Sequence, residues 1–121
     1  MFDLIFYRDT SGKSEIVDYL DALQNISNKD KHARINRQKI LAYMAALSEH
    51  GTRLGEPFVK HLVGDIWEPR PLRNRIFFFC WKGNQIVLLH HFLKKSQKTP
   101  KRELEQAIRN RRDFLKRSEK R

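Results

Sequence analysis

The sequence predicts an α+β domain, with an antiparallel sheet, an N-terminal helical hairpin packed on it and a C-terminal basic helix. Residues 13–50 and 100–115 repeat apolar residues at helical spacing. Residues 66–93 contain short runs of aromatic and β-branched residues, which favour strands. A Gly-Asn pair separates the last two runs and is typical of a β-hairpin. The expected order is β-α-α-β-β-β-α, in one domain spanning residues 1–121.

The N-terminal half is expected to form one strand and two helices. Residues 2–8 are rich in Phe, Ile and Tyr, and they predict the first strand. Residues 13–24 carry apolar residues at i, i+4 and i+7, which predicts an amphipathic helix. Candidate N-caps of a second helix ending at His50 are Ser27, Asn28 and Asp30. The expected buried side of that helix consists of Ile35, Ile40, Leu41, Met44 and Leu47.

The C-terminal half supplies most of the sheet. Residues 51–64 have no clear period and are punctuated by Gly and Pro, so we expect a loop there. The predicted strands are residues 66–70, 75–81 and 85–93. Thr99 as N-cap and Pro100 at the first helical position predict the start of the C-terminal helix. The expected buried side of this helix consists of Leu104, Ala107, Ile108, Phe114 and Leu115.

The Gly83-Asn84 pair also predicts a strand register. If these two residues form the whole turn, Lys82 pairs with Gln85. The further expected pairs are Trp81 with Ile86, Phe77 with His90, Arg75 with Phe92, and Arg73 with Lys94. One face then receives an apolar set: Ile76, Phe78, Cys80, Val87, Leu89, His91 and Leu93. The other face receives a basic and aromatic set: Arg73, Arg75, Phe77, Phe79, Trp81, His90, Phe92 and Lys94. Like charges opposite one another are unfavourable unless an anion lies between them, so the second face predicts an anion site.

The charge of the chain is unevenly distributed. Twenty-five Lys and Arg against 14 Asp and Glu give a net charge of +11. Residues 94–121 alone carry twelve basic and four acidic side chains, or +8. Such an asymmetry favours a polyanionic partner, above all nucleic acid. A solvated basic tail without a single partner is the alternative interpretation.

Common enzyme and metal signatures are absent from the sequence. It contains no Gly-rich phosphate loop, no nucleophile elbow and no Cys or His pair at zinc spacing, so no metal or other cofactor is expected. The single Cys80 excludes an internal disulfide. No apolar run is long enough to span a bilayer, and no secretory signal is visible, so we expect a cytoplasmic protein.

The remaining polar constellation suits metal-independent RNA cleavage. In that reaction the ribose 2′-hydroxyl attacks the adjacent phosphorus, so the enzyme must accept a proton and stabilise a phosphorane. Arg73 and Arg75 would hold the scissile phosphate, and Lys94 would stabilise charge or move a proton. The proton acceptor stays open between Glu68, His90 and a lysine among crowded cations. The residues expected to steer RNA are Arg70, Lys95 and Lys98, and those expected to stack a base are Phe77 and Phe92.

Two strings in this region resemble a known family. They are W-E-P-R-P-L-R-N-R-I-F-F-F-C-W-K-G-N at 67–84 and V-L-L-H-H-F-L-K-K-S-Q-K-T-P at 87–100. The first resembles the W-E-L-R-P-L-x-x-R-I-x-F run of RelE-like toxins of the HigB branch and its phage-derived relatives. The second resembles the L-L-H-x-F-x-K-K-T-Q-K-T-P run of the same branch. Pro69 stands where Leu is more usual, and Ser96 replaces Thr.

The resemblance implies a microbial-ribonuclease-like fold and a toxin that cuts mRNA in the ribosomal A site. It also implies a helix-turn-helix antitoxin, a heterotetramer of two toxins and two antitoxins, and repression of operator DNA through the antitoxin. Position by position, Arg70 and Arg75 match the basic pair of the first string, and Lys94 matches the basic residue that closes the last core strand. Some relatives place an aromatic hydroxyl near the C-terminus, but no Tyr follows Tyr43 in this chain.

Two other functions fit the same residues. A non-catalytic nucleic-acid- or ribosome-binding module would use the positive charge for phosphate contacts alone. A partner-dependent regulator would use the basic C-terminal helix to dock an acidic antitoxin.

Overall fold

The computed structural model describes residues 1–95 and 98–119, and it has the predicted α+β fold. Three α-helices, a short 3₁₀ helix and five strands follow one another along this part of the chain. They are β1 (Asp3–Phe6), α1 (Glu15–Ile26), α2 (Lys31–His50), η1 (Gly51–Leu54), β2 (Val59–Val63), β3 (Ile66–Pro69), β4 (Asn74–Trp81), β5 (Gln85–Leu93) and α3 (Lys101–Ser118). None of the helices in the described ranges is long and apolar enough to cross a membrane.

The five strands form one sheet in the order β1-β5-β4-β3-β2. β1 runs parallel to β5, and the other three neighbouring pairs are antiparallel. The sheet is therefore mostly antiparallel, as expected, and its single parallel pair follows from the helical hairpin that separates β1 from the other strands.

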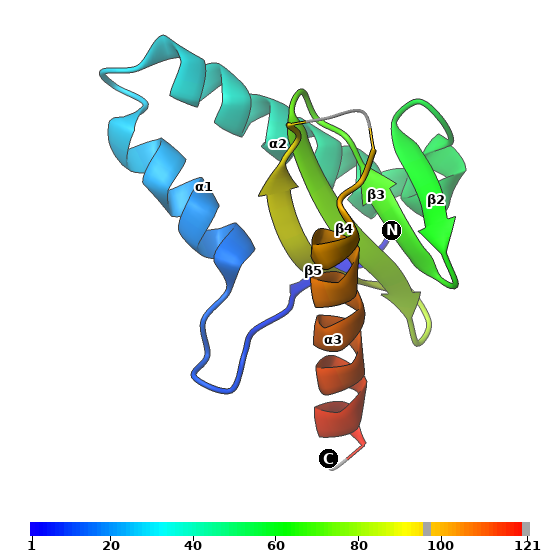
Figure 1. Ribbon diagram of the computed structural model, residues 1–121. Helices are drawn as coiled ribbons and strands as arrows, with labels where there is room; N and C mark the ends of the chain where they lie inside the picture. Colours follow the sequence, from blue (N-terminus) through cyan, green and yellow to red (C-terminus); the bar gives the residue numbers. More distant parts are fainter. Residues whose placement is uncertain (96–97, 120–121) are drawn as a thin grey trace.

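The helices cover the two faces of the sheet (Figure 1). α1 and α2 pack on one face, with Ile76 and Phe78 of β4 beneath them. α3 packs on the other face, over Phe77 and Phe79 of the same strand. The apolar side predicted for α3 is confirmed, because Ala107 is fully buried and its apolar neighbours pack around the same cluster. On α2, Ile35 and Leu41 were expected to be buried but are exposed, since only Ala33, Ile40, Met44 and Leu47 turn towards the sheet.

One of the predicted N-caps of α2 is confirmed, because Asp30 caps this helix through the amides of His32 and Ala33. Ser14 caps α1 by accepting a hydrogen bond from the Val17 amide. The N-cap of α3 is Pro100 and not Thr99. The Thr99 hydroxyl instead reaches the carboxylate of Glu68, at 3.5 Å.

The loop predicted for residues 51–64 is wrong, because it contains η1 and the edge strand β2. β2 pairs with β3 and places Lys60 opposite Glu68. Only Val59 is fully buried in this strand, so its sequence lacks the alternation that identifies a half-buried strand.

The β4–β5 register is correct at one end of the hairpin and wrong at the other. The turn has three residues and not two, with positive φ at Lys82 and Gly83, so Trp81 pairs with Gln85 instead of Ile86. A bulge between Phe77 and Phe78 restores the predicted register beyond it. The pairs Phe77–His90 and Arg75–Phe92 are confirmed.

The bulge places Leu89 and His90 on the same face of the sheet, under α3. Between the turn and the bulge, the predicted faces of β5 are therefore exchanged. Ile86 and Leu88 pack under α1 and α2, whereas Val87 and Leu89 pack under α3. The backbone carbonyl of Leu89 accepts a hydrogen bond of 2.8 Å from the side-chain amide of Asn110 on α3, a contact between the bulge and this helix.

Candidate functional site

A cation-lined cavity lies where the ends of four strands meet the N-terminal end of α3. Its volume is about 230 Å³. The residues that line it are Lys60, Arg70, Arg75, Phe92, Lys94, Lys98 and Thr99. We call it the cation cavity. Among the described residues that line it, none is a carboxylate or an imidazole.

Arg75 is the most deeply placed cation of this cavity, with 9% of its surface exposed. One guanidinium nitrogen, Nη1, donates to the backbone carbonyls of Leu72, at 3.0 Å, and Asn74, at 2.7 Å. Burial lowers the pKa of Arg75, the charge of Glu68 opposes that shift, and the charge of Arg70 adds to it. The surroundings thus hold the guanidinium in place while making its positive charge costly, which favours a bound anion.

The chain segment that holds Arg75 is fixed by a buried amide. Asn74 is fully buried, and its Nδ2 donates to Asn36 on α2, at 2.6 Å, and to the Pro71 carbonyl, at 3.0 Å. Its Oδ1 lies 2.9 Å from Nε2 of His91. Burial lowers the pKa of His91 to about 4, so this imidazole is neutral near pH 7. These contacts secure the start of β4 from the opposite face of the sheet.

Glu68 lies behind the wall of the cavity and has no exposed surface. Its Oε1 accepts a hydrogen bond of 2.9 Å from Nε of Arg70, and its Oε2 is the partner of Thr99. The carboxylate therefore joins β3 to the segment that leads into α3.

Arg73 and Lys94 oppose each other as predicted. The Lys94 amide donates to the Arg73 carbonyl, at 2.7 Å, and Nη2 of Arg73 lies 3.5 Å from the Lys94 carbonyl. Lys94 lines the cavity, but Arg73 and Lys95 are exposed and do not. The structure brings together Arg70, Arg75, Phe92, Lys94 and Lys98.

Like Glu68, Arg73 and Lys95, the predicted site residues Phe77 and His90 do not line the cavity. Phe77 is fully buried under α3, so its ring has no face that could stack a nucleobase, and that expectation is wrong. His90 is buried between two carboxylates and does not line the cavity. Its Nε2 lies 2.8 Å from Glu103 on α3, and its Nδ1 lies 3.1 Å from Glu15 on α1. Both residues were placed on the correct face, but α3 covers that face where they lie.

Lys60 and Thr99 are lining residues that sequence reasoning missed as site members. Lys60 lay in the predicted loop, and its pairing with Glu68 becomes visible only once β2 is known to be a strand. Around Lys60, polar and apolar residues do not alternate regularly, so the sequence contains little indication of a strand there. The described residues contain no group of three or more His, Cys, Asp or Glu that could hold a metal ion.

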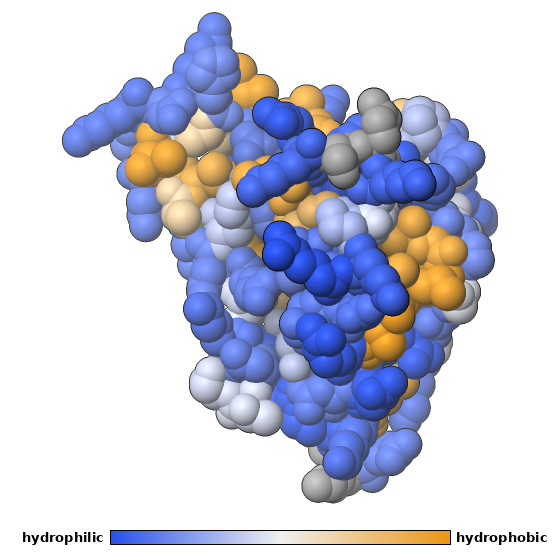
Figure 2. Space-filling view, viewed as in Figure 1, coloured by the Kyte–Doolittle hydropathy of each residue, from blue (hydrophilic) through white to orange (hydrophobic). Residues whose placement is uncertain are grey.

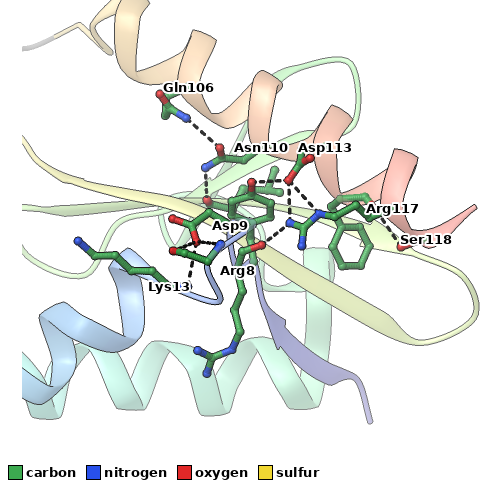
Figure 3. Close-up of polar contacts among 12 residues, drawn as sticks. Arg8, Asp9, Lys13, Gln106, Asn110, Asp113, Arg117 and Ser118 are labelled. Carbon is green, nitrogen blue, oxygen red and sulfur yellow. Dashed lines mark hydrogen bonds and ion pairs between the residues drawn. The ribbon is translucent and has the colours of Figure 1, made fainter. Parts of the chain in front are cut away.

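The far end of α3 carries a different kind of polar cluster (Figure 3). Asp113 accepts hydrogen bonds from the Tyr7 hydroxyl, at 2.6 Å, and from Nε and Nη2 of Arg117, at 3.0 and 2.7 Å. Arg117 also donates to the carbonyl of Arg8. The hydrogen bond from Tyr7, and less strongly the one from Arg117, lowers the pKa of Asp113. Burial and the contact with Asp113 raise the pKa of Tyr7 to about 12. This cluster attaches the end of β1 to α3.

Hydrophilic side chains dominate the face of the molecule over α3 (Figure 2). The exposed positions of this helix include Lys101, Arg102, Arg109, Arg112 and Lys116. A basic surface therefore continues from the mouth of the cation cavity along the helix.

One family model matches the chain. It is described as "Phage derived protein Gp49-like (DUF891)" and matches residues 18–112, which include every residue that lines the cation cavity. No curated protein matches the chain.

Proposed function

Because the chain belongs to the Gp49-like family of phage-derived proteins, which lies in the area of the RelE- and HigB-like toxins, we propose that it is a toxin that cuts RNA. Its substrate is mRNA held on the ribosome, and the products are a 2′,3′-cyclic phosphate and a free 5′-hydroxyl. The HigB-like strings at residues 67–84 and 87–100 support the ribosome-bound substrate.

The cation cavity is the observation that carries this proposal. Five Lys and Arg side chains, from two strands and from the segments that follow β3 and β5, surround a space of about 230 Å³. Holding so many like charges together is unfavourable in the free protein, and a phosphate relieves it. Arg75 is the strongest element of the site, because its planar fork is already immobilised by two backbone carbonyls.

In the proposed reaction the 2′-oxygen forms a bond to phosphorus, and the bond from phosphorus to the 5′-oxygen breaks. The 2′-hydroxyl loses a proton, and the leaving 5′-oxygen gains one. Arg75 and Lys94 stabilise the negative charge of the phosphorane, while Arg70 and Lys98 orient the flanking phosphates. A cavity lysine in its neutral amine form accepts the proton of the 2′-hydroxyl, because no carboxylate or imidazole stands among the described lining residues, and a protonated cavity lysine gives one to the 5′-oxygen.

The proposed partners are the ribosome and a helix-turn-helix antitoxin, in a complex of two toxins and two antitoxins that acts on operator DNA. The net charge of +11 supports both an RNA-rich and an acidic partner.

Mapping RNA ends after expression of the protein tests the proposal. Translation-dependent cuts within messages are expected for the wild type, and Lys94→Ala should reduce them at least about a hundredfold, since it removes a charge that stabilises the phosphorane. An equally expressed Lys39→Ala variant is the matched control, because this exposed lysine on α2 does not line the cavity. Full cleavage by Lys94→Ala would contradict the assignment of the site.

The lack of a lining carboxylate or imidazole in the described chain also favours a second candidate, a ribosome-binding protein that blocks translation without cutting. In that case messages would remain intact on stalled ribosomes, and Lys94→Ala would weaken ribosome binding alone.

A further inference from the structure

Glu68 is an acidic residue at the junction of the elements that form the cation cavity. It faces Lys60 across the β2–β3 pair, binds Arg70 just beyond the end of its own strand, and reaches Thr99 in front of α3. Its charge also acts on Arg75 in the adjacent strand β4. A single carboxylate thus contacts or influences residues from four separate parts of the cavity wall.

Both carboxylate oxygens are already engaged. Oε1 lies 2.9 Å from Nε of Arg70, and Oε2 lies 3.5 Å from the Thr99 hydroxyl. The side chain is 0% exposed and does not line the cavity. A general base must come within about 3 Å of the proton it removes, directly or through one water, and a substrate in the cavity would not reach this carboxylate.

We propose that Glu68 is a positioning residue that orients Arg70 and anchors the Thr99 segment, and that it does not accept the substrate proton. The proposal rests on the cavity being the RNA-cleaving site. Because Nε of Arg70 is held by the carboxylate, the plane of the guanidinium is fixed and its two Nη groups remain available for phosphate oxygens. The Thr99 contact keeps Lys98 and the start of α3 beside the same phosphate.

The charge of Glu68 has an opposite effect on anion binding. A buried negative charge beside five cations reduces the positive potential that an incoming phosphate meets. Replacing the carboxylate by a neutral amide therefore strengthens or preserves anion binding, while the geometry needed for cleavage is lost. Binding and turnover should change in different directions, which a general loss of structure does not produce.

The test compares Glu68→Gln with the wild type, using steady-state cleavage of mRNA on purified ribosomes. We expect kcat to fall at least tenfold, KM to stay unchanged or decrease, and the pH-rate profile to keep its shape. Glu68→Asp retains the charge but has a shorter reach, so it should recover part of kcat. Asp113→Asn is the matched control, because it removes a carboxylate that holds an arginine on α3 far from the cavity. It should leave kcat and KM unchanged.

A second readout does not depend on activity. The Nε–H resonance of Arg70 should be sharp and slow to exchange in the wild type, and it should broaden in Glu68→Gln. The affinity for inorganic phosphate, followed by chemical shifts of the cavity residues, should be equal or higher in the variant. If the wild type cuts no RNA, the proposed function fails, whereas these two measurements still judge the role of Glu68.

Three results would overturn the inference. Loss of the acidic limb of the pH-rate profile in Glu68→Gln would identify Glu68 as the proton acceptor. An unchanged kcat, or an unchanged Arg70 resonance, would mean that the carboxylate positions nothing. A parallel loss of phosphate affinity, kcat and folded protein in both Glu68 variants would reduce its role to stability.

Discussion

Positively charged side chains have different surroundings at the two ends of α3. At the C-terminal end, Arg117 is matched by Asp113, which also accepts a hydrogen bond from Tyr7. At the N-terminal end, five Lys and Arg side chains surround the cation cavity, and Glu68, which binds Arg70, is buried behind its wall. The same helix thus borders a neutralised cluster and a strongly positive one.

This difference separates structural charges from binding charges. An arginine whose partners all belong to the protein contributes to stability, and its replacement lowers the free energy of unfolding. Cations that outnumber the carboxylates beside them oppose folding slightly and become favourable when an anion arrives. The comparison therefore supports the proposal that the N-terminal end of α3 is the end that binds an external anion.

The largest expected effect is on cleavage, when a cation of the cavity is replaced. Arg75→Gln should lower RNA cleavage at least about a hundredfold, because it removes a fixed donor to the phosphorane. Arg117→Gln should leave cleavage unchanged and lower only stability. Cleavage assays and urea unfolding of both variants check the pair, and equal activity losses would refute the division of roles.

The next effect concerns His91, which lies on the opposite face of the sheet from Arg75 and which burial keeps neutral near pH 7. Because burial lowers the pKa of His91 from 6.5 to about 4, the unfolded chain binds its proton more readily. Stability from this residue is complete above pH 6.5 and is lost as the pH falls towards 4. The upper limit is about 3 kcal/mol, from 1.36 kcal/mol per pH unit.

Urea unfolding between pH 4 and 7 measures this dependence. His91→Gln should flatten the stability profile in that range, whereas replacing the exposed His50 by Gln should not. A wild-type profile without an acidic decline would contradict the buried neutral imidazole.

A smaller effect tests the neutralised end. Tyr7→Phe removes the 2.6 Å bond to Asp113 and should lower the free energy of unfolding by about 1 kcal/mol, since the site is partly exposed. A double-mutant cycle with Asp113→Asn should show coupling between the two residues. Strict additivity of the two losses would mean that the bond contributes nothing.

The smallest effect concerns a single surface lysine at each end. Lys60→Ala should reduce the salt dependence of nucleic-acid binding by about one unit of slope, because one phosphate contact is lost. Lys82→Ala is the control, since this lysine lies over Trp81 at the far end. Affinities measured at several salt concentrations decide whether only the cavity lysine affects the slope.

The strings of apolar and basic residues were sufficient to predict most of the fold and the core of the cation cavity. Arg75 and Phe92 were paired correctly because the bulge compensates for the error at the turn. Neither the three-residue turn nor the bulge could be read from the residues, since Lys82 adopts a positive φ without being Gly, Asn or Asp. The error reversed the faces of Ile86 to Leu89.

Other misses have a common cause in tertiary contacts. β2 is an edge strand with one buried residue, so its formation depends on pairing with β3 and not on its own pattern. The burial of Phe77 and His90 depends on where α3 crosses the sheet, which no local spacing indicates. Site residues were therefore assigned to the correct face before it was known which part of that face remains open.

The hydrogen bond from Asn110 to the Leu89 carbonyl aligns α3 lengthwise on the sheet. A helix that slid by a single turn would travel about 5.4 Å along its axis, and this amide would then have no carbonyl to meet. This buried hydrogen bond fixes the position of α3 along its axis, near the middle of the helix. It thereby sets how far Lys98 and Thr99 extend over the strand ends. Shortening α3 by one residue ahead of Asn110 would therefore misalign the mouth of the cavity without touching any residue that lines it.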